Sequence, residues 1–167
     1  KGNIVEPLPL AADLSERSGC AAEMGIEGVR YYLASTMPFE NDSVFTYEDF
    51  DRRYNSDLAN DLGNALNRSL SMAHKFCDGV VPEAPIEKEA HEAIEAAKQA
   101  VQSAMAGFRI DHATHAAWDV VRFLNKYIDT RAPWALAKNN DPALPSVLRS
   151  MLLCLRASEG LVRFILP

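Results

Sequence analysis

The stretch TYEDFDRRYNSDLANDLGNALNRSLSMAHKF, residues 46–76, decides the fold, because its apolar residues recur about every four positions. Residues at this spacing share one face of a helix. The stripe consists of Phe50, Tyr54, Leu58 and Leu62, continued by Ala65 or Leu66 and by Leu70. Thr46 has the position of an N-cap, since its hydroxyl can accept a hydrogen bond from the free amide of Asp49. The pattern predicts one amphipathic helix from residue 46 to about residue 76.

The rest of the chain predicts more helices and no strand, because no alternating apolar pattern exceeds a few residues. We expect helices over 26–37, 86–105, 109–130 and 142–166, and a short turn of helix from Trp134 to Lys138. Pro38 and Gly107 end the first two, and FENDSVF, residues 39–45, is expected to be a loop. The inward residues are expected to be Ile94, Val101 and Met105 in the second helix, and Ala113, Ala117, Val120, Leu124, Tyr127 and Ile128 in the third.

Residues 1–25 are expected to be irregular, because Pro7 and Pro9 disfavour a helix interior and Gly19 and Gly25 interrupt the remainder. The fold class predicted is therefore all-α: an antiparallel bundle of four or five helices behind a small irregular N-terminal appendage.

Composition excludes several classes of protein. No apolar run approaches the roughly 20 residues of a membrane helix, so we expect a soluble domain without a membrane partner. The first residue is Lys1 and no signal peptide pattern follows, which favours a piece of a longer protein. The cysteines, Cys20, Cys77 and Cys154, are far apart without a CxxC pair, which disfavours a zinc knuckle and fits a reducing, cytoplasmic compartment.

The charge is acidic overall but uneven. Net charge is −6, which argues against nucleic-acid binding by bulk electrostatics, and residues 83–95 contribute −4 of it. Residues 107–138 instead sum to +2. If an anionic partner docks, the face with Arg109, Arg122, Lys126, Arg131 and Lys138 is favoured, and an ordinary solvated helix face is the alternative.

Catalytic and metal-binding patterns are weak. His112 and His115 lie three positions apart on one predicted helix face, without an accompanying cysteine or Glu-x-x-His pattern, so surface histidines are favoured over a metal site. Neither a nucleophile elbow nor a Walker loop occurs. We predict no catalytic residue and no metal site in this chain.

Two features can serve RNA recognition. Asn64 and Arg68 lie four apart on one helix face, where an amide and a guanidinium can read base edges or brace a phosphate. The alternative is a surface asparagine beside an arginine paired to an acid such as Asp61 or Asp57. Trp134, in DTRAPWALAK, is either a plug between helices or a platform on which an unpaired base stacks.

Three segments together resemble one family. They are GNIVEP (residues 2–7), RYYLASTMPFENDSVFTYEDFDRRYNSDLANDLGNALNR (residues 30–68) and KYIDTRAPWALAK (residues 126–138). In this order they resemble the bacterial-type methionyl-tRNA synthetases, which are class I aminoacyl-tRNA synthetases. The resemblance implies that residues 1–45 are the end of the stem-contact fold after the KMSKS signature, and that residues 46–167 are the α-helical anticodon-binding domain.

The resemblance also implies a function. The family ligates methionine to its tRNA with ATP and Mg²⁺ in a Rossmann-type domain, whose HIGH signature does not occur here; no cofactor is expected in this part. The family's residues for the CAU anticodon fall on Asn64, Arg68, Pro133 and Trp134, with the tryptophan stacking on a base. The partners implied are the tRNA for methionine and, through the catalytic domain, methionine and ATP.

One segment departs from the family. LPLAADLSERSGCAAEMGIEGV, residues 8–29, replaces a shorter link of the form LxxxYGxDAL, and Gly28 stands where the family prefers alanine. Two other function classes stay open on sequence alone. One is a helical protein-interaction domain of a divergent paralogue, and the other is a metal-binding bundle at His112 and His115.

Overall fold

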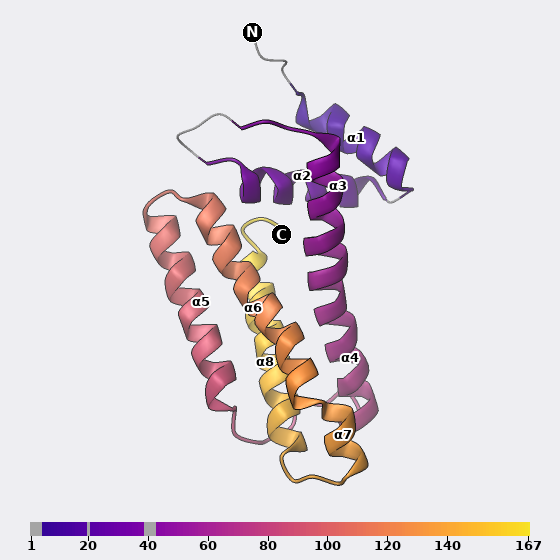
Figure 1. Cartoon of the computed structure of the whole chain (residues 1–167), viewed down its shortest axis with the longest axis vertical. Helices are drawn as coiled ribbons and strands as arrows, with labels where there is room; N and C mark the ends of the chain where they lie inside the picture. Colours follow the sequence, from indigo (N-terminus) through magenta and orange to yellow (C-terminus); the bar gives the residue numbers. More distant parts are fainter. Residues whose placement is uncertain (1–4, 20, 39–42) are drawn as a thin grey trace.

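A computed structural model describes residues 5–19, 21–38 and 43–167, and the described part of the chain is helical without strands (Figure 1). The all-α fold class is therefore confirmed. The elements are α1 (Pro7–Ser18), α2 (Ala22–Thr36), α3 (Tyr47–Arg53), a π-helical stretch η1 (Tyr54–Leu62), α4 (Gly63–Cys77), α5 (Lys88–Ala106), α6 (Ile110–Arg131), α7 (Pro133–Lys138) and α8 (Leu144–Val162).

The stretch from residue 47 to residue 77 forms one continuous helix, as its periodicity predicts, with η1 between α3 and α4. We call residues 47–77 the long helix. Thr46 caps it, and its Oγ1 accepts a hydrogen bond from the amide of Asp49 at 3.2 Å, which confirms the expected N-cap. A repeat of four residues is longer than the 3.6 residues of an α-helical turn and drifts around the helix. The wider π turns of η1 counter that drift while Phe50 and Leu58 stay on the packed side.

Beyond Leu62 the apolar stripe continues through Ala65, one of the two residues predicted, and the prediction of Leu70 is wrong. Leu66 and Leu70 have 47% and 45% of their surface exposed, whereas Ala65, Ser69 and Ala73 are buried. The reason is that α-helical geometry resumes at Gly63, so the packed face follows steps of three and four residues from Leu62 through 65, 69, 72 and 76, and positions 66 and 70 turn away from it.

The main core lies between α4, α5, α6 and α8, and Leu124, Ile128, Val147 and Met151 are buried at its centre. All six residues predicted to face inward on α6 are buried. On α5 the prediction holds for Ile94 and Val101 but is wrong for Met105, which is 42% exposed. Met105 is on the last turn of α5, where it lines an open groove with Ile110 and Phe164.

The N-terminal region is helical, so the expectation of an irregular appendage is wrong. Pro7 and Pro9 lie in the first turn of α1, where the missing amides have no helical partner to lose. Gly19, at φ 65°, ends α1 in the left-handed region. Gly25 does not interrupt a helix, because it lies inside α2. A Cβ at this position would lie 2.0 Å from Ser15 Oγ, so the absence of a side chain lets α1 and α2 pack closely.

This α1–α2 hairpin is tied to the bundle. Phe50 of α3 is buried against α1 and α2, and Arg30 Nε donates a hydrogen bond to the carbonyl of Ile165 at 2.9 Å. The division into two domains at residue 45 stays a prediction. The first residues of GNIVEP, Cys20 and residues 39–42 of the expected loop lie outside the described residues. Within the described residues, no helix is long and apolar enough to span a membrane.

Candidate nucleic-acid interface

A sharp corner joins α6 to α7 at the end of the bundle where α4 also ends (Figure 1). Ala132 stands between the two helices at φ 42° and ψ 64°, the left-handed region that reverses a chain. Its carbonyl accepts hydrogen bonds from the amides of Ala135, at 2.8 Å, and Leu136, at 3.2 Å. Pro133 takes the first position of α7, where its fixed φ suits a helix entrance.

The two residues that follow this turn have opposite environments. Pro133 is fully buried, whereas Trp134 has 47% of its surface exposed. The plug interpretation of Trp134 requires a buried indole, and the buried tryptophan of this chain is Trp118, at 0% exposure. The corner therefore anchors Pro133 and leaves much of the Trp134 ring accessible to a ligand.

A polar network supports the corner from the side of the bundle. Arg131 Nη2 lies 2.5 Å from Glu87 Oε1, and the hydroxyl of Tyr127 donates a hydrogen bond to Glu87 Oε2 at 2.7 Å. The amide of Glu87 in turn donates to Ser150 Oγ at 2.8 Å. Burial, and then the hydrogen bond to Glu87, raise the pKa of Tyr127, so its hydroxyl stays a donor. Glu87 thus connects the N-terminus of α5 to α6 and α8, a role that no sequence pattern identified.

We expect Glu87→Ala to lower the free energy of unfolding by about 2 kcal/mol, because it removes the charged partner of Arg131 and the carboxylate that accepts the hydrogen bond of the partly buried Tyr127 hydroxyl. Chemical denaturation measures this value. The matched control is Glu95→Ala, since Glu95 forms an exposed ion pair with Lys98 on the same helix and its loss should cost at most about 0.5 kcal/mol. Equal losses for the two variants would contradict a supporting role for Glu87.

Asn64 and Arg68 both lie on α4, as predicted, and their environments differ. Arg68 Nη2 lies 2.5 Å from Asp129 Oδ1. The acid is thus one on α6 rather than Asp61 or Asp57, because the side chain of Arg68 reaches across to the neighbouring helix. Asn64 is exposed, and its side chain makes no hydrogen bond with the described part of the chain.

The ion pair between Arg68 and Asp129 brings the two predicted site segments together. Asp129 lies in the last turn of α6, directly before the corner that carries Trp134. Helix α4 also contacts α7. The exposed face of α4 with Asn64 and the half-exposed Trp134 therefore belong to adjoining elements at one end of the bundle. Sequence reasoning did not identify Asp129 as the residue that joins them.

Two of the five cations on the basic face proposed from the sequence pair with acids within the chain. Arg122 pairs with Asp119 at 2.9 Å, Arg131 pairs with Glu87, and Arg109 contacts His112. Lys126 and Lys138 are exposed, and neither forms an ion pair with a described residue. His112 and His115 line a shallow groove between α5 and α6. The described residues contain no group of three or more histidines, cysteines and acids that could hold a metal ion.

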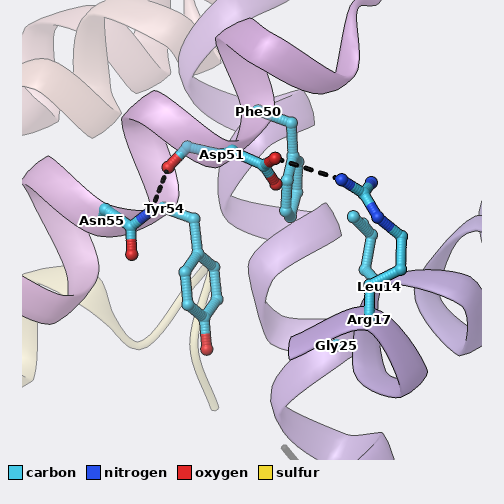
Figure 2. A pocket seen from close by; sticks show the side chains of 7 residues that line it. All are labelled: Leu14, Arg17, Gly25, Phe50, Asp51, Tyr54 and Asn55. Carbon is cyan, nitrogen blue, oxygen red and sulfur yellow. Dashed lines mark hydrogen bonds and ion pairs between the residues drawn. The ribbon is translucent and has the colours of Figure 1, made fainter. Parts of the chain in front are cut away.

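A separate pocket of about 270 Å³ lies between α1, α2 and the long helix (Figure 2). Its walls include the aromatic pair Phe50 and Tyr54, whose ring centroids are 5.9 Å apart, and the bare backbone of Gly25. Arg17 and Asp51 form an ion pair across it at 3.2 Å, and Asn55 Nδ2 donates to the carbonyl of Asp51 at 2.8 Å (Figure 2). These contacts satisfy polar groups between the hairpin and the bundle, and we assign the pocket no ligand.

Comparison with known proteins identifies the family. Residues 16–70 match the model of a family described as tRNA synthetases class I (M). Over 171 residues the chain is 39% identical to a protein of Enterococcus faecalis named methionine–tRNA ligase, an alignment that covers 99% of this chain and 24% of the relative. The chain belongs to the methionyl-tRNA synthetase family. A methionine–tRNA ligase of Bacillus subtilis is also 39% identical, over 163 residues that cover 95% of this chain and 23% of the relative.

Solved structures of methionyl-tRNA synthetases share the fold. The apo form of the Mycobacterium tuberculosis methionyl-tRNA synthetase superposes with a TM-score of 0.80 at 30% identity, over 98% of this chain and 33% of that one. The same enzyme bound by methionyl-adenylate gives a TM-score of 0.80, at 30% identity over 99% of this chain and 32% of that one. The chain spans about a quarter of the length of the curated relatives that it matches.

Proposed function

We propose that this chain reads the CAU anticodon of the tRNA for methionine, as the anticodon-binding part of a methionyl-tRNA synthetase. The observation that carries the proposal is the pairing of a buried Pro133 with a half-exposed Trp134 at a corner next to α4. A flat ring held at the rim of a rigid bundle suits an unstacked base, because single-stranded RNA is recognised by stacking on aromatic side chains and by hydrogen bonds to base edges.

Each site residue has a role in this proposal. The Trp134 ring stacks on one anticodon base, and Pro133 fixes where the ring projects. The Asn64 amide, which is exposed, offers both donors and an acceptor to a base edge. Arg68 is held in place by Asp129 and presents the remaining donors of its guanidinium to the RNA.

We also propose the activity of the full-length protein, on the basis of its family. It joins methionine to its tRNA at the expense of ATP, with Mg²⁺, in the cytoplasm. The proposal assigns that chemistry to the catalytic domain and not to the residues described here. This chain contributes recognition of the tRNA, and the free thiols of Cys77 and Cys154 suit a reducing compartment.

Binding of two RNA hairpins tests the proposal. The full-length gene product is titrated at low salt with the anticodon stem-loop of the methionine tRNA, carrying CAU, and with the same hairpin altered at the first anticodon base. Tighter binding of the CAU hairpin supports the proposal. Equal affinity for both hairpins would favour a helical protein-interaction domain.

We expect Asn64→Ala to reduce the preference for CAU by roughly tenfold, because one base edge loses its hydrogen-bond partner, which is worth about 1 kcal/mol or more. The ratio of the two dissociation constants measures this preference. The matched control is Asn55→Ala. Asn55 is also exposed, but it lies on η1, earlier on the helix than Asn64 and therefore farther from the corner. If Asn64→Ala weakens both hairpins equally, Asn64 contacts the backbone and not a base.

A further inference from the structure

The long helix and α6 run in the same direction (Figure 1). Their contacts join residues that are a constant number of sequence positions apart, and this register shows which residues of α6 lie beside Asn64. Trp118 Nε1 donates to the carbonyl of Asp57 at 3.2 Å, and Arg68 pairs with Asp129. Each contact joins residues 61 positions apart. The same offset pairs Asp61 with Arg122, whose Nε lies 3.9 Å from Asp61 Oδ2.

Two of these contacts bracket a short window of the surface. The Asp61–Arg122 contact stands at one end and the Arg68–Asp129 pair at the other, about two helical turns apart. On the long helix the exposed residues inside this window are Asn64, Leu66 and Asn67, and Asn64 lies at its middle. On α6 the exposed residue at the same level is Lys126, because Asn125 turns inward and donates to the carbonyl of Asp61 at 2.8 Å.

Lys126 differs from the other charges of the window because it has no partner there. Its neighbour one turn earlier is Arg122, a like charge, and its neighbour three positions later is Asp129, which Arg68 already engages. The other charges are engaged with one another: Arg68 pairs with Asp129, and Arg122 contacts both Asp61 and Asp119. Lys126 is thus the cation of the described window whose ammonium is available to an anion.

We propose that Lys126 contacts a backbone phosphate of the RNA whose bases meet Asn64 and Trp134. This inference rests on the proposed function and adds a positioning contact to it. A lysine ammonium acts as a point charge with rotatable donors, which suits a phosphate, whereas base edges are read by groups of fixed geometry. Such a contact also explains how an acidic chain holds RNA, since one well-placed cation beside the bases acts locally and the net charge of −6 acts at longer range.

A salt titration with three variants tests the assignment. The full-length gene product is titrated with the CAU hairpin and with the altered hairpin at several salt concentrations. For Lys126→Ala we expect affinity for both hairpins to fall by roughly threefold to tenfold, and the slope of log affinity against log salt to shrink by about 0.7–0.9, the value of one phosphate contact. Lys126→Arg should retain affinity, because it keeps the charge.

The control is Lys98→Ala, which changes the net charge by the same unit on α5, where Lys98 pairs with Glu95. Unchanged affinity and slope for Lys126→Ala would overturn the assignment, and so would an equal effect of Lys98→Ala. A loss confined to the CAU hairpin would make Lys126 a base-reading residue instead. If the unaltered protein does not prefer CAU, the proposed function is wrong and the Lys126 contact is wrong with it. If the unaltered protein prefers CAU but Lys126→Ala has no effect, only the Lys126 contact is wrong.

Discussion

Trp134→Ala weakens binding of the CAU hairpin by a factor of about 5 to about 150, because stacking of one base on an aromatic ring is worth roughly 1–3 kcal/mol. The free energy of unfolding changes by less than about 1 kcal/mol in the same variant. Both expectations follow from the 47% exposure of the ring, since the accessible part is available to a base and only the remainder packs against the protein. Fluorescence titration measures the first quantity and chemical denaturation the second.

The substitution Trp134→Phe separates stacking from packing. A phenyl ring keeps part of the stacking surface, so we expect an affinity between those of the unaltered protein and the alanine variant. The outcome that would restore the plug interpretation is a loss of several kcal/mol of stability in Trp134→Ala with little change in the affinity of the remaining folded protein.

Periodicity predicted the parts of this fold whose packing depends on one helix at a time. The inward residues of α6 follow from their spacing alone, because both flanks of that helix are covered by α5 and α8. The N-cap at Thr46 is equally local, since the hydroxyl and the amide that it satisfies are three residues apart.

The N-terminal hairpin shows why local rules failed elsewhere. Pro7, Pro9 and Gly25 disfavour the middle of an isolated helix, and local rules therefore predict an irregular segment here. In the structure the prolines occupy a first turn, and Gly25 is required by the close approach of α1. Both facts depend on where the helix begins and on a second helix, neither of which a pattern within one segment contains.

The candidate site likewise contains residues that the sequence could predict and residues that it could not. The resemblance to the family predicts Asn64, Arg68, Pro133 and Trp134 as site residues, and the structure places these four residues on adjoining elements. It did not identify Asp129 or Glu87, because each acts through a partner far along the chain: Arg68 is 61 positions from Asp129, and Arg131 is 44 positions from Glu87. Ion pairs of this kind have no sequence spacing by which they could be predicted.

The second large effect concerns the other tryptophan. Trp118→Ala should lower the free energy of unfolding by about 3–5 kcal/mol, the usual cost of truncating a buried aromatic residue. Trp118 is at 0% exposure, its ring centroid lies 4.4 Å from that of Tyr31, and its Nε1 donates to the carbonyl of Asp57. The variant therefore loses buried apolar surface, a ring contact and a hydrogen bond together.

Trp118→Phe distinguishes these contributions. Phenylalanine keeps most of the apolar burial and leaves the Asp57 carbonyl without its donor, so we expect a loss of about 1–2 kcal/mol. Denaturant unfolding of both variants, with Trp134→Ala as the exposed tryptophan for comparison, gives the values. Trp118 holds η1 against α6 at the offset of 61 positions that also brings Asp61 to Arg122 and Arg68 to Asp129, on either side of Asn64. The phenylalanine variant should therefore still fold and should bind the CAU hairpin less selectively. Full selectivity in that variant would show that the Arg68–Asp129 pair and the packing of α4 suffice to align the two helices.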